Sequence, residues 1–188
     1  LAWYGEFNQV RNRFFKEKKV FDGLVPASTG IGGGNAADAA LEAGLLALRP
    51  KHLGVEVSVV PSPLQSSARD YGSSFSRAVE VAAPDHRRLY ISGTASIDKA
   101  GHTVFLDDTQ AQVKMTMEVV QAILQSRSMD WANVTRSLAY FKKAQDASLL
   151  GAYCREQALP AFPVIVAEND VCRDDLLFEI EVDAIQAR

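Results

Sequence analysis

The sequence predicts an α+β domain in which helices cover one face of a mixed β-sheet. Two observations lead to this prediction. From about residue 75 onward, strand-like and helix-like segments follow one another in the order β-β-α-β-α-β, which is typical of helices segregated on one side of a sheet. The last of these segments, 176–184, alternates apolar and acidic side chains, as a strand with one buried face does.

The first third of the chain contains weaker patterns. Residues 6–18 carry aromatic and apolar side chains at helical spacing and predict an amphipathic helix. Residues 20–25 are rich in β-forming residues, and the glycine-rich segment 26–35 after them predicts a loop. The alanine and leucine content of 35–48 predicts a helix, and the alternation over 55–60 predicts a strand.

The next elements begin near residue 75. Strands are expected over 75–81 and 89–93, separated by a turn at 84–87. Residues 98–101 have the composition of a hairpin turn.

A long helix is expected from Thr109, because Thr109 and Gln112 have the spacing of a capping box. Residues 134–141 predict a strand, and Asp146 is a candidate cap for a helix that runs to Cys154. Strands at 164–166 and 176–184 complete the order.

Composition limits the function. The 188 residues are 47% hydrophobic and 23% charged, which indicates a soluble globular chain of one domain, or of one domain and part of another. The net charge is −3, from 20 basic and 23 acidic residues, so we expect no broad nucleic-acid-binding face. No apolar run approaches the roughly 20 residues of a membrane span. Cys154 and Cys172 have no metal-ligand spacing and are interpreted as reduced thiols of a cytoplasmic protein.

Residues 75–186 resemble the YjgF/RidA superfamily, whose members have also been called endoribonuclease L-PSP or translation initiation inhibitors. Five segments carry the resemblance in order: Phe-Ser-Arg-Ala-Val at 75–79, Leu-Tyr-Ile-Ser-Gly at 89–93, the helix from Thr109, Pro-Ala-Phe at 160–162 and Phe-Glu-Ile-Glu at 178–181. The resemblance implies the fold of Bacillus chorismate mutase, no cofactor or metal, and a homotrimer with ligand sites in the clefts between subunits.

Three segments, 26–32, 73–78 and 170–177, are similar to those of the chorismatases within this superfamily. Those enzymes hydrolyse chorismate to pyruvate and a dihydroxycyclohexadiene or hydroxybenzoate acid. The resemblance therefore implies a hydrolase that cleaves the enolpyruvyl ether of chorismate, a small carboxylate substrate.

The resemblance also implies a division of the chain. Chorismatases join a RidA-like C-terminal part to an N-terminal relative of the same fold. In the early part of the chain, a predicted helix is followed by the segments 25–28 and 55–57. The later part has the same order, with a predicted helix followed by the segments 159–162 and 178–180. We therefore expect a partial N-terminal half-unit at 1–61, whose first half is missing from this chain, a connector at 62–74 and a RidA-like domain at 75–188.

Glu179 is the candidate catalytic residue. Strand alternation places it with Glu181 and Asp183 on the face opposite the apolar side chains. Three acids on one strand face usually indicate solvent exposure, and this is expected for Glu181 and Asp183. The resemblance puts Glu179 at the position of the family's active-site acid, where an apolar cleft would raise its pKa and let it donate a proton.

A dicarboxylate such as chorismate requires cationic partners, preferably arginine. Arg77 lies in the Phe-Ser-Arg motif, directly after Arg69 and Tyr71, and any of these arginines can instead be structural. Tyr90 and Gly93 fall where relatives contact ligands, and Gly93 could offer its amide. The candidate substrate-binding residues are Arg77, Tyr90, Gly93, Tyr153, Arg155 and Phe162.

Two alternatives to the hydrolase stay open. The first is an enamine or imine deaminase of the RidA type. Those enzymes carry Pro-Ala-Arg where this chain has Pro-Ala-Phe, so Phe162 removes the carboxylate-binding charge; it either packs on a substrate ring or fills the core. The second is a non-catalytic module of the same superfamily that binds a small acid.

Overall fold

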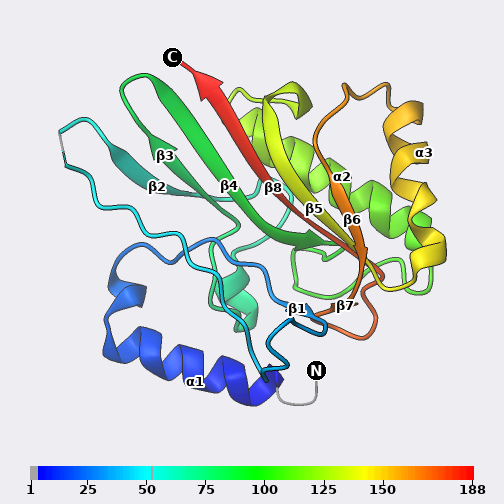
Figure 1. The fold of residues 1–188 in the computed structure, drawn as a ribbon, viewed down its shortest axis with the longest axis horizontal. Coiled ribbons are helices and arrows are strands. Elements are labelled where there is room, and N and C mark those ends of the chain that lie inside the picture. Colours follow the sequence, from blue (N-terminus) through cyan, green and yellow to red (C-terminus); the bar gives the residue numbers. More distant parts are fainter. Residues whose placement is uncertain (1–3, 52) are drawn as a thin grey trace.

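The computed structural model describes residues 4–51 and 53–188. It confirms the α+β class: a six-stranded mixed sheet carries two helices, α2 and α3, against one face (Figure 1). All neighbouring strands are antiparallel except the last pair, β5 and β6, which is parallel. In spatial order the strands are β2 (Glu56–Val60), β3 (Ala78–Ala82), β4 (His86–Ala95), β8 (Phe178–Ala187), β5 (Val134–Phe141) and β6 (Ile165–Glu168).

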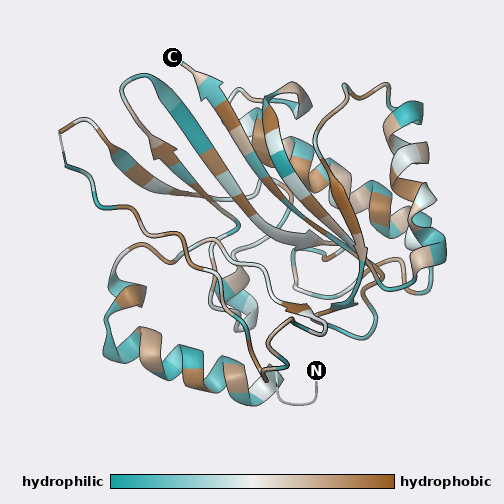
Figure 2. Ribbon diagram, in the orientation of Figure 1, coloured by the Kyte–Doolittle hydropathy of each residue, from teal (hydrophilic) through white to brown (hydrophobic). Residues whose placement is uncertain are grey.

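The core lies between the sheet and α2 (Thr109–Ser126). Four side chains of β8, Phe178, Ile180, Val182 and Ala184, are completely buried, as the alternation predicted. Figure 2 shows hydrophobic and hydrophilic residues alternating along β5 and β8. The shorter helix α3 (Ser148–Glu156) adds Leu150 to the same core.

The N-terminal part packs away from α2 and α3 (Figure 1). Helix α1 (Tyr4–Glu17) confirms the amphipathic helix expected at 6–18, although none of its residues is fully buried. A small second sheet pairs β1 (Ile31–Gly32) antiparallel with β7 (Asp170–Val171). The 3₁₀ turns are η1 (Val20–Asp22), η2 (Ala68–Tyr71), η3 (Trp131–Asn133) and η4 (Ala144–Asp146).

Strand β2 confirms the strand expected at 55–60, and it extends the main sheet. It pairs with β3 over five residues, from Glu56 opposite Ala82 to Val60 opposite Ala78. Residues 56–60 therefore belong to the sheet that the rest of the chain builds. The assignment of 1–61 to half of a second unit, with a connector at 62–74, stays a prediction.

One expected element is wrong, and one segment does not form what its composition favours. Residues 20–25, which are rich in β-forming residues, begin with the 3₁₀ turn η1 and contain no strand. The segment 35–48 forms no helix: only a turn held by the Asn35 side chain is present, and the leucines after it are at least half exposed. A short helix needs an apolar face docked on a partner to be stable in water, and this segment buries none.

Both expected helix caps are also wrong. Asp108, not Thr109, caps α2, because its Oδ1 accepts from the Ala111 amide at 2.9 Å. The Thr109 hydroxyl instead donates to Asp146 Oδ2 at 2.9 Å. The Asp146 carboxylate therefore binds the first residue of α2, and α3 begins without a side-chain cap.

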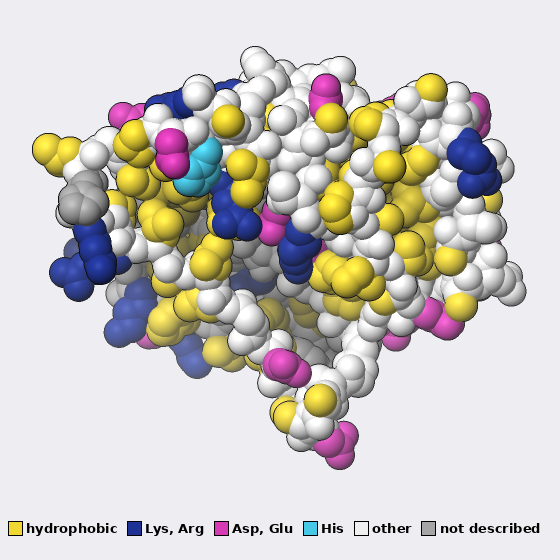
Figure 3. Space-filling model, turned by 45° about the horizontal axis from the view of Figure 1, so that its top comes forward, with side chains coloured by type: hydrophobic (Ala, Val, Ile, Leu, Met, Phe, Trp, Pro, Cys, Tyr) yellow, Lys and Arg dark blue, Asp and Glu magenta, His cyan; other side chains and the backbone are white. Residues whose placement is uncertain are grey.

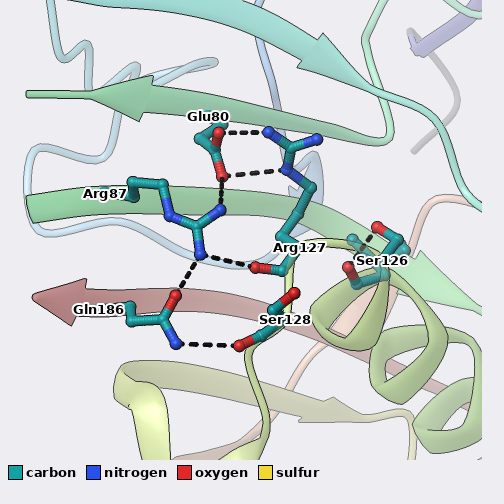
Figure 4. Close-up of polar contacts among 7 residues, drawn as sticks. Glu80, Arg87, Ser126, Arg127, Ser128 and Gln186 are labelled. Atoms are coloured by element: carbon teal, nitrogen blue, oxygen red, sulfur yellow. Dashed lines mark hydrogen bonds and ion pairs between the residues drawn. The ribbon is translucent and has the colours of Figure 1, made fainter. Parts of the chain in front are cut away.

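A polar cluster fastens the connection after α2 to the sheet (Figure 4). The buried Glu80 of β3 accepts two hydrogen bonds from Arg127 and lies 3.7 Å from Arg87 of β4. Arg87 in turn donates to the Arg127 carbonyl, and Gln186 of β8 donates to the carbonyl of Ser128. Three strands are thereby joined to one helix end.

An apolar groove runs between α3 and β6, where hydrophobic side chains gather in Figure 3. Leu150 and Phe162 contribute to its floor, and Val164 and Val166 to its rim. Ile165, next to them on the edge strand, is 66% exposed. Separately, no described helix has both the length and the apolar character needed to cross a membrane.

Candidate functional site

Glu179 lies on β8, the strand between β4 and β5, and points away from α2. Its face is not open to solvent, because the N-terminal segment crosses it. Tyr4 of α1, together with Ser28 and Gly30, closes a pocket around the carboxyl group. Glu179 is therefore only 4% exposed, whereas Glu181 and Asp183 on the same strand face are partly exposed. We call this cavity the Glu179 pocket.

Burial is the main cause that raises the pKa of Glu179 to about 8, and the neighbouring negative charge of Glu181 contributes to the same shift. No side chain of the described residues forms an ion pair or hydrogen bond with this carboxyl group. A carboxyl group in this environment is neutral near pH 7 and holds a proton that it can donate.

Gly93 of β4 makes room for this carboxyl group. A Cβ atom at position 93 would lie 1.9 Å from Oε1 of Glu179 and 2.8 Å from Cγ2 of Thr29. The Gly93 amide donates to the Thr29 hydroxyl at 2.9 Å, so in this structure it holds the N-terminal segment. Next to it, the Ser92 hydroxyl accepts from the Ser28 amide at 2.9 Å.

Two arginines line the Glu179 pocket, and sequence reasoning identified neither. Arg173 comes from the connection between β7 and β8, and Arg11 comes from α1. Arg11 donates to Asn8, but its buried Nε has no partner. Arg173 lies in the segment 170–177 that carried the chorismatase resemblance, which is the signal that could have revealed it.

Tyr71 and the hairpin at Gly101 hold Arg173 in place. The guanidinium of Arg173 donates to the Gly101 carbonyl at 2.7 Å and lies 5.4 Å from the centroid of the Tyr71 ring. Gly101 has φ +86°, and a Cβ there would lie 2.8 Å from Cβ of Tyr71. Only glycine meets both conditions at this turn.

The other titratable groups of the pocket are neutral. Burial raises the pKa of the Cys172 thiol to about 12 and raises the pKa values of the Tyr4 and Tyr71 hydroxyls. The pocket thus combines two cationic guanidiniums with a protonated carboxylic acid. Such an arrangement attracts an anion and can deliver a proton to it.

Of the seven predicted site residues, the structure brings only Glu179 and Gly93 together. Arg77 is buried behind the pocket: its Nε donates to the Ser66 carbonyl at 3.0 Å, and its guanidinium lies 5.3 Å from the Tyr71 ring centroid. Burial lowers the pKa of Arg77. It supports Tyr71 from outside the pocket, facing a separate cavity.

The remaining four lie elsewhere. Tyr90 of β4 packs against Arg88, whose guanidinium lies 5.3 Å from the ring centroid. Phe162 stacks on Trp131 with ring centroids 4.8 Å apart, so it fills the core. Tyr153 and Arg155 lie on α3 and line two clefts on the helix side of the sheet. Their assignment to a substrate site stays a prediction.

Among the described residues, no group of three or more histidine, cysteine, aspartate or glutamate side chains is placed to hold a metal ion.

Comparisons with known proteins agree with this fold. A chorismatase from Streptomyces hygroscopicus is 26% identical over 198 aligned positions, covering 96% of this chain and 55% of that protein. A 3-hydroxybenzoate synthase from the same organism is 26% identical over 200 positions, covering 95% and 56%. The chain thus spans about half the length of these relatives.

Solved structures share the fold over 70% of the chain. A chorismatase crystal structure matches with a TM-score of 0.60 and 23% identity, over 44% of its own length. An endoribonuclease L-PSP homologue from Entamoeba histolytica matches over its full length with a TM-score of 0.58 and 18% identity. The family model described as endoribonuclease L-PSP matches residues 68–186, more than half of the sequence. The chain therefore belongs to the endoribonuclease L-PSP family, the YjgF/RidA superfamily.

Proposed function

We propose that the Glu179 pocket is the site of a chorismatase-like hydrolase. Glu179 transfers its proton to the methylene carbon of the enolpyruvyl ether of chorismate or a similar substrate, leaving a cation at the ether carbon. Water adds to that carbon and returns a proton to Glu179. The resulting hemiketal splits into pyruvate and the ring alcohol, so protons and electrons balance without a cofactor.

The observation that carries this proposal is the buried Glu179 carboxyl group in one pocket with Arg11 and Arg173. Protonation of an enol ether carbon needs an acid that keeps its proton near pH 7, and burial supplies one. Arg11 and Arg173 supply forked donors for the two carboxylates of the substrate. The relatives named chorismatase and 3-hydroxybenzoate synthase support the same reading.

Substrate entry requires a movement of α1. The Glu179 pocket holds about 80 Å³, well below the roughly 300 Å³ of a small ligand pocket. Tyr4 and Arg11 of α1 form part of its wall, and α1 contains no buried residue. A helix attached this weakly can shift to admit a ring-sized substrate.

The packing of Phe162 supports the hydrolase over the deaminase. This partly buried side chain stacks on Trp131 at the edge of the core and does not line the Glu179 pocket. A cytoplasmic location and a homotrimer, which the cysteines and the family resemblance imply, belong to the same proposal.

The test is pyruvate release from chorismate, followed by a coupled lactate dehydrogenase assay. We expect turnover by the parent chain and a loss of at least about a hundredfold in Glu179→Gln, since general acid catalysis contributes roughly that much. Glu118→Gln, an exposed acid on α2, is the matched control and retains the parent rate. The parent rate falls as the pH rises through about 8, where Glu179 loses its proton.

Three other outcomes contradict parts of the proposal. Equal rates in the parent and Glu179→Gln remove Glu179 from the mechanism. Chorismate binding by calorimetry without turnover indicates the non-catalytic acid-binding module. Neither binding nor turnover excludes the hydrolase for this chain.

A further inference from the structure

A second cleft lies between α1 and the loop after η2. It has a volume of about 410 Å³ and is lined by three cationic side chains, Arg13 and Lys16 from α1 and Arg69 from η2. No acidic residue of the described chain lines it. We call it the basic cleft. The positive charge of this cleft contrasts with the rest of the protein, because the whole chain carries a net charge of −3.

None of the three cations forms an ion pair with another described residue. Every ion pair formed within the described residues involves other side chains, at His86, Arg87, His102, Arg127 and Arg136. The Arg69 guanidinium lies 4.9 Å from the centroid of the Phe21 ring, which fixes its direction without neutralising it. Three positive charges that converge without an acid repel one another unless an anion joins them.

A hydrogen bond links the two walls of the cleft in this structure. The Ser74 hydroxyl donates to Asn12 Oδ1, which ties α1 to the loop. The loop is tightened by Gly72 (φ +87°) and by the Ser73 amide, which donates to the Ala68 carbonyl at 2.9 Å. Ser73 lines both the basic cleft and the Glu179 pocket.

We propose that the basic cleft is a binding site for a compact dianion, a phosphate group or a small dicarboxylate. The guanidiniums of Arg13 and Arg69 provide forked donors from opposite walls, and Lys16 adds a third charge. The shared lining residue Ser73 places a bound anion beside the Glu179 pocket. This inference does not depend on the proposed hydrolysis, because it concerns a different cleft and different cations.

The experiment is an NMR titration of the ¹⁵N-labelled chain with inorganic phosphate and, separately, with malonate, at an ionic strength held constant with sodium chloride. We expect saturable shifts of the Gly72 and Ser73 amides. The double variant Arg13→Gln, Lys16→Gln binds the anion about tenfold more weakly or worse. Both side chains are exposed, so the fold tolerates the change.

The matched control is the double variant Arg49→Gln, Lys51→Gln, which removes the same charge from exposed positions outside the cleft. It binds like the parent. A second test variant, Arg69→Gln, loses affinity from the opposite wall. Saturation by phosphate alone, malonate alone or both identifies the anion and supports the site.

The inference is overturned by shifts that rise linearly without saturation, by equal affinities in the cleft and control variants, or by shifts confined to Gly93 and Cys172. The last result assigns the anion to the Glu179 pocket.

Discussion

Glu179 and Glu80 are both buried carboxyl groups, but their pKa values move in opposite directions. Burial, followed by the negative charge of Glu181, raises the pKa of Glu179 to about 8. Hydrogen bonds from Arg127 lower the pKa of Glu80. The charged form of Glu179 therefore destabilises the folded chain, whereas the charged form of Glu80 stabilises it.

The raised pKa of Glu179 predicts how stability changes with pH. The unfolded chain loses this proton near pH 4.5, the ordinary pKa of glutamate, but the folded chain keeps it until about pH 8. The stability of the parent chain relative to Glu179→Gln therefore falls as the pH rises from about 4.5 to 8 and is constant above that. Urea unfolding of both chains at pH 5 and pH 8.5 measures this. A constant difference would show that Glu179 ionises normally.

Gly93→Ala is expected to disturb the Glu179 pocket. The new Cβ would lie 1.9 Å from Oε1 of Glu179, so the carboxyl group or β4 must shift, at a cost of about 1–3 kcal/mol. Gly34→Ala, where nothing lies within 4 Å of an added Cβ, is the control and changes stability little. Thermal denaturation of the two variants compares them. Equal stabilities of the two variants would mean that the new Cβ and the Glu179 carboxyl group move apart with no loss of folding free energy.

The family resemblance singles out Glu179 and Gly93, because the motifs at 178–181 and 89–93 are short stretches of sequence. Strand alternation gives only the face of β8 on which Glu179 lies, and by itself it indicates solvent exposure. Arg11 reaches the pocket only because α1 packs against a distant part of the chain, and no strand or helix period encodes that contact. Arg155 lies on α3, on the other side of the sheet from the Glu179 pocket, and its role in a substrate site stays a prediction.

Burial decides which helices form. The helix at α2 was predicted correctly because its apolar stripe, including Met117 and Leu124, is buried against the sheet. The segment 35–48 has good helix formers, but its leucines find no partner, and Leu45 is 87% exposed. Composition alone could not separate the two cases, because propensity contributes less than docking.

The start of α2 depends on Asp108. Asp108→Ala removes the side chain that accepts from the Ala111 amide and is expected to cost about 1 kcal/mol. Gln110→Ala, an exposed change in the same turn, is the control and costs little. Urea unfolding gives the two free energies. A cap at Thr109, as the sequence indicated, would leave Asp108→Ala as stable as the control.

The cluster in Figure 4 connects the sheet with the end of α2 across the whole domain. Glu80→Gln leaves Arg127 and Arg87 without their shared acid and is expected to cost about 2 kcal/mol at pH 7. Because the pKa of Glu80 is lowered in the folded chain, its contribution is present above the unfolded value of 4.5 and disappears as the pH falls through the folded value.

Denaturation of Glu80→Gln and the parent at pH 7 and pH 3 tests this, and the difference between them is smaller at the lower pH. Glu181→Gln is the matched control, because it breaks an ion pair with Arg136 whose side chain is half exposed. Such a pair contributes less than about 1 kcal/mol. Equal losses in the two variants would show that burial adds nothing to the Glu80 cluster.

The hairpin at Gly101 has a practical consequence for anyone who redesigns this protein. Its backbone touches Tyr71 on one side and anchors Arg173 on the other, so a peptide tag or reporter inserted there would displace two walls of the pocket at once. The exposed segment 36–51 does not line the Glu179 pocket. A tag or reporter is better inserted in the segment 36–51, where we expect the pocket to keep its shape.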